Sequence, residues 1–516
     1  MAADLNALTG TYYLDHLESL LAAVKGRYGD LFDSDEQALL ADFAALPVDA
    51  RALYARFLSR RGSCFRQDKL HYRELDVEQA IHHLAKSGFI APAPADNSVI
   101  LPLLTKAEIG HFYGLDAKQK RPVLLQQAQL MAVPALPFWV WQTLNEGLFR
   151  RCLLLYFGNA YQDLSEFITT TLEHVRYESY PLDSASRFYQ DRPHLERHFQ
   201  LAELAKTLDA TDDEALVALA DSWPQGDDNR WQRLTLQLAR RLERAGCWQQ
   251  ALAFYEKLSL PPARERRVRV LEKQQGVEAA WQALVPIIQA PKDASEQDFI
   301  DIFGQRLAKK CGQLLPQQAV STLPEWQKPL LAGEQSVEQK ALCYFADGMH
   351  SENQLMTGLF GLLFWDIIFA PIPGAFFHPF QRGPRDLFSQ QFYPRRQALI
   401  DQRLTDIASG WQQRAHITFA NKYGIANALV QWPFWTEQRL ALCRHISGAH
   451  LVAWFRHYLA DPRHHRSGFP DLLVVEERGY RLVEVKGPGD RLQPGQKRWL
   501  RTLASQGLPV AVLHLN

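Results

Sequence analysis

Two short β-type runs near the end of the chain constrain its fold more than any other feature. Residues 471–477 read DLLVVEE and residues 480–487 read YRLVEVKG, so only Arg478 and Gly479 separate them. Apolar and β-branched residues dominate both runs, and a two-residue connection with glycine in second position is typical of a hairpin turn. The sequence therefore predicts a β-hairpin closed at Arg478 and Gly479.

Pairing about that turn places three charged side chains on one face. Asp471 would lie opposite Lys486, and Leu473 opposite Glu484. Because side chains alternate across a sheet, Asp471, Glu484 and Lys486 then share a face, while Val485 points away and leaves its carbonyl oxygen at the edge of the cluster. Such a group suits phosphodiester hydrolysis, because Mg²⁺ and Mn²⁺ prefer oxygen ligands and an ammonium group stabilises a charged transition state.

The alternative is an exposed hairpin whose charges form ordinary salt bridges. Pro470 and the apolar flanks LLVV and LVEV indicate instead that the hairpin is buried. Buried charges without a ligand are costly, so the pattern favours a functional site.

The rest of the chain is long enough for several domains. Its 516 residues exceed the size of a single core. Equal numbers of basic and acidic residues, 57 of each, mean that any nucleic-acid surface must come from local patches. Six cysteines without a CxxC pair argue against zinc ribbons and disulfides and favour a reducing compartment, and no secretory signal is recognisable. We expect a cytoplasmic protein whose longest apolar run, residues 355–377, forms a buried helix rather than a membrane span.

Basic residues gather in the N-terminal helical region, residues 1–95. The segment LSRRGSCFRQDKLHYREL is either a solvated helix face or a DNA-contacting patch, because basic groups neutralise phosphates and aromatic rings stack on bases. Its basic residues, which interleave with Phe65 and Tyr72, are Arg60, Arg61, Arg66, Lys69 and Arg73.

Residues 103–130 predict two short helices with a basic connector. The first would bury Leu104, Ile109 and Phe112 and end at Gly114, and the second would begin near Pro122 and bury residues 123–125. This pattern resembles a SAP-type DNA-binding module, although two helices with a basic linker also occur by chance. The connector residues that we expect to contact DNA are Lys118, Lys120 and Arg121.

Residues 195–320 carry an almost continuous helical pattern. Ala239, Gly246, Ala251 and Tyr255 match tetratricopeptide positions, although an ordinary helical hairpin would explain them too. The sequence contains no GxxxxGK[ST] motif, so we expect no nucleotide cofactor.

Four basic residues precede Asp471 in DPRHHRSGFPD. Arg463 and Arg466 are candidates for phosphate contact. The alternative, a metal site at His464 and His465, is disfavoured because adjacent side chains on an extended run point to opposite faces.

The strings GFPDLLVV and LVEVKGPGDRL resemble the VRR-NUC version of the PD-(D/E)xK nucleases. The chain as a whole is similar to bacterial members of the Fanconi-associated nuclease family, through LSRRGSCFR, FYQDRPHLERH and SENQLMTGLFGLLFWDIIF. The resemblance implies a mainly α, multidomain chain ending in an α/β nuclease core. Its parts would be an N-terminal helical DNA-contacting domain, a SAP-like module, a tetratricopeptide-like domain and the nuclease with its lead-in helix, at residues 1–95, 96–165, 166–340 and 341–516.

The resemblance also assigns roles. Asp471 and Glu484 match the metal-binding carboxylates, the Val485 carbonyl a backbone ligand, and Lys486 the catalytic lysine. Glu352 matches a further acidic ligand that the family contributes from an upstream helix.

Two further residues have competing interpretations. Asp366 is a rival to Glu352, but we expect it to form bonds within the core. Gln496 matches a glutamine that related nucleases often place near the metal, although it would also suit a solvated helix position.

The implied function is a structure-selective DNA nuclease that requires Mg²⁺ or Mn²⁺. It would act as a 5′-flap endonuclease and 5′–3′ exonuclease in interstrand crosslink repair, near the nucleoid, with branched or flapped DNA and other repair proteins as partners and no membrane. A four-way-junction-resolving nuclease and a non-catalytic repair scaffold are the alternatives. The scaffold would need a broken triad, and this triad is intact. The spacer between Asp471 and Glu484 departs from the family pattern, because it is short and has room for a tight hairpin and little more.

Overall fold

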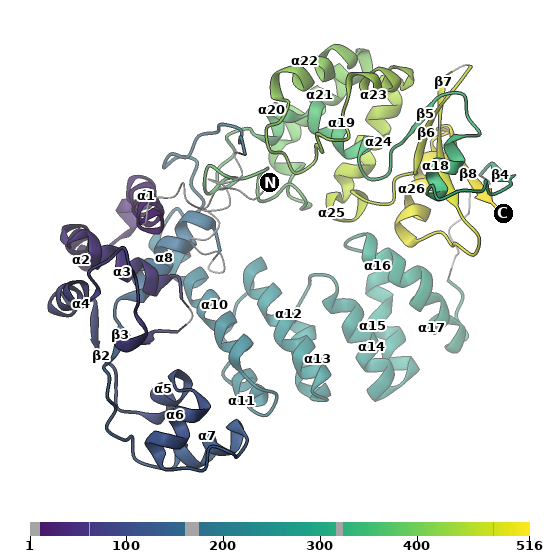
Figure 1. Cartoon of the computed structure of the whole chain (residues 1–516). Helices are drawn as coiled ribbons and strands as arrows, with labels where there is room; N and C mark the ends of the chain where they lie inside the picture. The colour runs from purple at the N-terminus through teal and green to yellow at the C-terminus, as the bar shows by residue number, and fades with distance from the viewer. Residues whose placement is uncertain (1–10, 61, 160–174, 316–322, 478) are drawn as a thin grey trace. The chain divides into compact units, whose positions relative to one another are not determined.

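The computed structural model describes residues 11–60, 62–159, 175–315, 323–477 and 479–516 (Figure 1). The chain divides into two compact units. Unit 1 comprises residues 1–174 and 182–199, and unit 2 comprises residues 175–181 and 200–516. The expected boundary between residues 165 and 166 lies outside the described residues, and each unit is considered by itself.

Unit 1 is helical, with one small antiparallel sheet of order β1-β3-β2. Its aromatic core joins Phe43, Tyr54, Phe89 and Phe149, with ring centroids 5.1–5.8 Å apart. Its elements are α1 (Tyr12–Tyr28), α2 (Ser34–Ala45), α3 (Val48–Leu58), β1 (Cys64–Arg66), α4 (Val77–Lys86), β2 (Ile90–Pro92), α5 (Asn97–Ile100), α6 (Lys106–Tyr113), α7 (Arg121–Gln129), β3 (Val140–Thr143) and α8 (Glu146–Phe157). Helix α10 (Arg192–Ala210) begins in this unit and ends in unit 2.

The two helices expected in residues 103–130 are α6 and α7. Gly114 ends α6 in a left-handed conformation with φ 67°, which glycine adopts without the steric cost of a Cβ atom. Leu124 is fully buried as expected, but Val123 is 41% exposed, so its predicted burial is wrong. The helix–linker–helix layout is confirmed, while its assignment as a SAP module stays a prediction.

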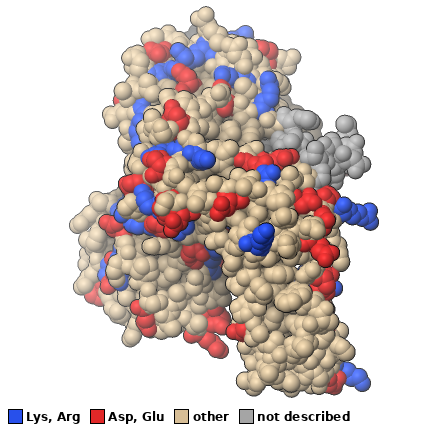
Figure 2. Space-filling model, turned by 90° about the vertical axis from the view of Figure 1, so that its left-hand side faces the viewer, with Lys and Arg blue, Asp and Glu red and all other residues tan. Residues whose placement is uncertain are grey.

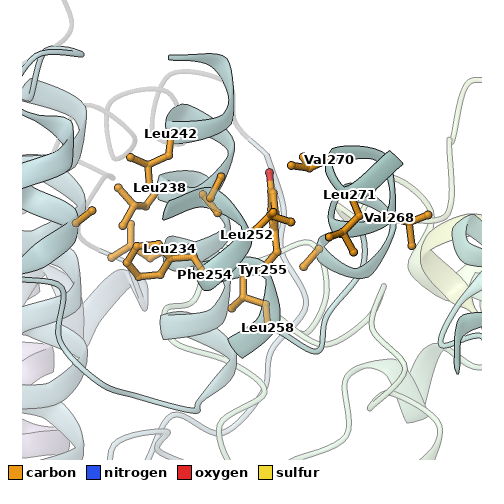
Figure 3. Close-up of a cluster of buried hydrophobic side chains, with 14 of the residues drawn as sticks. Leu234, Leu238, Leu242, Leu252, Phe254, Tyr255, Leu258, Val268, Val270 and Leu271 are labelled. Carbon is orange, nitrogen blue, oxygen red and sulfur yellow. The ribbon is translucent and has the colours of Figure 1, made fainter. Parts of the chain in front are cut away.

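The first part of unit 2 is a row of paired helices (Figure 1). Leucines of α12, residues of α13 such as Tyr255, and Leu271 of α14 form one continuous apolar cluster (Figure 3). Ala239 and Ala251, two of the tetratricopeptide-like positions, are fully buried within it, as small residues at a close helix contact should be. The helices are α11 (Leu216–Asp221), α12 (Asn229–Arg244), α13 (Trp248–Lys257), α14 (Ala263–Gln275), α15 (Val277–Gln289), α16 (Ala294–Phe299) and α17 (Gln305–Lys310).

The last part of unit 2 contains a five-stranded mixed sheet of order β4-β8-β7-β6-β5. Strands β5, β6 and β7 pair antiparallel, whereas β7, β8 and β4 pair parallel, with α26 connecting β7 to β8. The strands are β4 (Glu325–Lys328), β5 (Gly348–His350), β6 (Leu472–Glu476), β7 (Gly479–Lys486) and β8 (Val510–Leu515). The helices are α18 (Val337–Leu342), α19 (Leu355–Leu363), α20 (Trp365–Ile368), α21 (Gln397–Ser409), α22 (Gln412–Lys422), α23 (Glu437–Leu442), α24 (Gly448–Ala460), α25 (Pro462–His465) and α26 (Pro494–Ser505).

The long apolar run forms α19 and α20, and every residue of α19 is buried, which confirms the prediction of a core helix. Among the described residues, no helix combines the length and apolar character that crossing a membrane requires.

The hairpin exists, but its predicted register is wrong by two residues. Glu476 pairs with Gly479, so Leu472 faces Val483 and the position of Asp471 extends toward Glu484 rather than Lys486. Gly479, with φ 113°, is the first residue of β7 and not the second residue of the turn. Because the shift is an even number of residues, each side chain stays on its predicted face.

Candidate active site

Three charged residues of the hairpin lie buried at the start of β6 and the end of β7. Asp471, Glu484 and Lys486 are 6%, 0% and 7% exposed. Lys486 Nζ lies 2.8 Å from Glu484 Oε1, and the Val485 N–H donates to Asp471 Oδ2 at 2.8 Å. Val485 itself packs in the apolar cluster on the opposite face of the sheet, as the alternation predicted. The hairpin therefore holds two carboxylates and an ammonium group in fixed positions.

Close packing of three segments completes the site. Gly468, with φ 85°, lies so near the start of α26 that a Cβ atom there would be 2.6 Å from the carbonyl carbon of Gly495. Its N–H donates to Asn353 Oδ1 at 3.2 Å, and the Ser351 N–H donates to the Asp471 carbonyl at 2.6 Å. The turn before α19, the loop before β6 and the start of α26 thereby meet.

Glu352 lies in the turn before α19, not within a helix as expected. Asn353, which follows it, has a left-handed φ of 55° and donates from its side chain to Glu352 Oε1 at 3.0 Å. One ligand atom each from His350, Glu352 and Asp471 lies within 4.8 Å of the others, a spacing that suits a metal ion. The sequence interpretation missed His350, because its place beside Asp471 comes from the pairing of β5 with β6 and not from a local pattern.

Gln496 faces the lysine. Its Oε1 accepts hydrogen bonds from Lys486 Nζ at 3.1 Å and from the Gln493 N–H at 2.9 Å, the second within the capping box of α26. The start of α26 thus fixes the direction of the Lys486 ammonium group.

Electrostatics at the site favour a bound cation. Burial raises the pKa of Asp471 to about 6, and the nearby Glu352 charge adds to this rise. Burial raises the pKa of Glu484 to about 8, with a further contribution from Asp471. Carboxylates that repel one another in a buried site gain stability from a positive ion between them.

The donor set fits a divalent metal ion. Glu484 Oε2 is buried and has no hydrogen-bond partner among the described residues, a costly arrangement that a cation would relieve. Carboxylate oxygens from Glu352, Asp471 and Glu484 are ligands that hard divalent cations take. These residues therefore form a candidate metal site at this edge of the sheet.

Asp366 takes no part in this cluster. Its two carboxylate oxygens accept hydrogen bonds from Arg403 at 2.9 and 2.7 Å. Burial alone would raise the pKa of Asp366, but the Arg403 guanidinium lowers it below its ordinary value. Asp366 therefore bonds to another residue of the fold as expected, but its side chain is 63% exposed, so its expected position in the core is wrong.

Two pockets adjoin the candidate metal site, and His350 and Arg439 line both of them. The larger has a volume of about 730 Å³ and also exposes Arg444 and Gln438, and the smaller has a volume of about 360 Å³ and includes Glu352. Arginine side chains beside a metal site suit the phosphates of a DNA strand.

The basic residues before Asp471 lie partly in a short helix, α25, so the expectation of an extended run is wrong. His465 stacks on His457 with ring centroids 3.9 Å apart, and His464 pairs with Asp461 at 2.9 Å. Both histidines thus have structural partners. Arg463 and Arg466 are exposed, and they stay candidates for phosphate contact.

The basic segment of residues 58–75 is less available than its sequence indicates. Arg66 is 6% exposed and is held by Asp68 and Glu108, each at 2.8 Å. Phe65 is buried and stacks on Phe57, so it cannot receive a base. At these two residues neither alternative holds, because both side chains are buried rather than exposed to solvent or DNA.

The remaining N-terminal candidates are not tested by the fold. Arg60 is exposed, and Arg61 lies outside the described residues. Lys118 and Lys120 are exposed in the connector between α6 and α7, while Arg121 donates to the Leu104 carbonyl at 3.2 Å. On the face seen in Figure 2, basic and acidic side chains are mixed, in line with the zero net charge.

Comparisons with known proteins agree with this geometry. The VRR-NUC domain model matches residues 408–515, and the FAN1 HTH domain model matches residues 11–91. The Fanconi-associated nuclease 1 homolog of Pseudomonas aeruginosa is 34% identical over 98% of this chain and 96% of its own length. Human Fanconi-associated nuclease 1 is 26% identical over 98% of this chain, which spans 62% of the human protein. The crystal structure of paFAN1 bound to DNA with a 2-nucleotide 5′ flap and a gap is similar, with a TM-score of 0.83, 31% identity and coverage of 99% of both chains.

Proposed function

Because this chain belongs to the Fanconi-associated nuclease family, we propose that it cuts branched DNA beside a 5′ flap, as an endonuclease and a 5′–3′ exonuclease, in interstrand crosslink repair. The observation that carries the proposal is the buried cluster of Asp471, Glu484 and Lys486 with Glu352 nearby. The 5′-flap DNA bound to paFAN1 in its crystal structure supports this substrate class. The present chain would act in the cytoplasm near the nucleoid, with other repair proteins as partners and no nucleotide cofactor.

The chain supplies the ligands and the groups that hold the reactants. Glu352, Asp471, Glu484 and the Val485 carbonyl would hold Mg²⁺ or Mn²⁺. The bound cation would supply positive charge that polarises the scissile phosphate and offsets the charge of the transition state.

Lys486 has the two neighbours that a positioning group needs. Glu484 and Gln496 fix its ammonium group from two sides, at 2.8 and 3.1 Å. We assign Lys486 two roles: it orients the attacking water and it stabilises the phosphate oxygens. Water oxygen bonds to phosphorus while the bond to the leaving oxygen breaks, and that oxygen gains a proton.

A panel of end-labelled 5′ flaps, 3′ flaps, forks and four-way junctions tests the proposal. The 5′ flap should be cut fastest with Mg²⁺ or Mn²⁺, and EDTA should stop all cleavage because it removes the divalent cation that the carboxylates would hold. Symmetric cutting of the four-way junction as the fastest reaction would assign the chain to junction resolution instead. Tight binding of flaps without any cleavage would make it a scaffold.

A further inference from the structure

A histidine beside the carboxylates gives the site a nitrogen donor. His350 Nε2 lies 3.8 Å from Glu352 Oε2, and both residues belong to the group whose ligand atoms converge with Asp471. We propose that His350 binds the same divalent cation through Nε2, and that this contact makes the site prefer Mn²⁺ to Mg²⁺. The inference rests on the proposed function, because it assumes that the carboxylates hold a cation.

The backbone fixes His350 next to the hairpin. His350 is the last residue of β5 and pairs with Leu472, the residue after Asp471. The following residue, Ser351, donates its N–H to the Asp471 carbonyl at 2.6 Å, and its hydroxyl donates to the Pro470 carbonyl at 3.1 Å. The histidine side chain is nevertheless 43% exposed, so its ring can turn toward a cation without disturbing the core.

Each of the two carboxylates keeps one oxygen that no hydrogen bond occupies within the described residues. Asp471 Oδ2 accepts the Val485 N–H, and Glu352 Oε1 accepts from the Asn353 side chain. Within the described chain no hydrogen bond engages Asp471 Oδ1, and the contact of Glu352 Oε2 is the one with His350. Because one ligand atom from each of His350, Glu352 and Asp471 lies within 4.8 Å of the others, the three side chains could bind one cation together.

Proximity of a histidine to a carboxylate is not enough for this inference. His416 Nδ1 lies 3.5 Å from Glu437, and His514 Nε2 lies 3.7 Å from Glu325. In the part of the chain that the structure describes, neither pair gains the third converging ligand that His350 has. His416 is therefore a matched control, with the same side chain beside a single carboxylate.

A nitrogen ligand changes which cation the site selects. Mg²⁺ prefers oxygen ligands in a strict octahedral arrangement, whereas imidazole is a common ligand of transition metals. Loss of His350 should therefore weaken Mn²⁺ binding far more than Mg²⁺ binding.

Pulsed electron paramagnetic resonance on the full chain loaded with one equivalent of Mn²⁺ tests the contact directly. Wild type and His416→Gln should show the ¹⁴N modulation of a coordinated imidazole, and His350→Gln should lack it. Titration calorimetry should show Mn²⁺ affinity reduced by at least about tenfold in His350→Gln, the lower end of the cost of losing a supporting partner of a metal site. Mg²⁺ affinity, measured by competition, should stay near the wild-type value.

The possible outcomes distinguish a failure of the His350 contact from a failure of the proposed nuclease function. Saturable Mn²⁺ binding without ¹⁴N modulation in wild type would overturn the role of His350 and leave the metal-dependent nuclease intact. Absence of Mn²⁺ binding in wild type would instead contradict the proposed function. Reduced flap affinity in His350→Gln with unchanged Mn²⁺ spectra would assign the histidine to DNA and also overturn the inference.

Discussion

The nuclease hairpin and the connector between α6 and α7 both gather charged residues, but they hold them in opposite ways. Asp471, Glu484 and Lys486 are almost fully buried, whereas Lys118 and Lys120 are exposed. Buried charges are costly without a partner, so the hairpin keeps its groups fixed for a ligand that binds at one point. Exposed ammonium groups can contact any phosphate and release its counterions. Mutations in the hairpin should therefore affect cleavage, and mutations in the connector should affect DNA binding.

The largest effect should come from the buried lysine. Lys486→Met removes the group that we assign to water positioning, and we expect single-turnover cleavage of a 5′ flap to fall at least about 100-fold, as for loss of one transition-state donor. Flap affinity should stay within several-fold of wild type, since DNA contacts are spread over many phosphates.

Arg481→Met on the same hairpin is the matched control. Arg481 pairs with Glu476 at 2.6 Å near the closed end of the hairpin, outside the cluster. Near wild-type cleavage by Lys486→Met, or an equal loss in Arg481→Met, would refute the assignment of the lysine.

The second comparison sets two acidic residues against each other. Glu352→Ala should lose cleavage and Mn²⁺ affinity but keep its unfolding temperature, because its side chain is 44% exposed. Asp366→Ala should keep Mn²⁺ affinity but unfold at lower temperature, because it leaves the buried Arg403 without its ion pair, at a cost of about 1–2 kcal/mol. The reverse pattern would exchange their roles.

The connector should affect binding alone. Each neutralised phosphate contributes about −0.9 to the slope of log affinity against log salt, so Lys118→Ala with Lys120→Ala should flatten that slope by up to about 2. The cleavage rate of saturated substrate should be unchanged. An unchanged slope would mean that the connector faces no DNA, and the SAP-like assignment would then be withdrawn.

The smallest effect concerns stability and pH. Burial lowers the pKa of His457 from 6.5 to about 3, so the folded chain keeps this ring neutral while the unfolded chain takes up a proton below pH 6.5. The free energy of unfolding should decrease as pH falls from 6.5, by at most about 1.4 kcal/mol per pH unit from this group. Between pH 7.5 and 5.5, the unfolding temperature should fall less in His457→Gln than in the wild type. The same fall in both proteins would contradict the contribution of a buried, neutral His457 to the pH dependence of stability.

The sequence predicted the features that depend on residues close together in the chain. Strand alternation placed Asp471, Glu484 and Lys486 on one face even though the register was wrong, because the error was an even number of residues. Glu352 and Gln496 were identified by family resemblance alone, since no local pattern shows that a distant turn or helix start will meet the hairpin.

Nonlocal pairing explains the other errors. The sequence left Arg66 open between a solvated helix face and a DNA-contacting patch, but Glu108, far along the chain, forms an ion pair with it. His350 was missed because its proximity to Asp471 arises from the pairing of β5 with β6, strands that are separated by more than a hundred residues. Sequence periodicity does not report such contacts, and only the fold reveals them.

Binding and cleavage measured on one preparation of Glu484→Gln test the role of the buried cluster most directly. This substitution keeps the side-chain shape, removes the charge of the fully buried carboxylate and leaves every exposed basic residue in place. We predict that 5′-flap affinity stays within several-fold of wild type while single-turnover cleavage with Mg²⁺ or Mn²⁺ is lost. Cleavage at a near wild-type rate, or a loss of cleavage fully explained by weaker DNA binding, would contradict a metal-dependent active site at this hairpin.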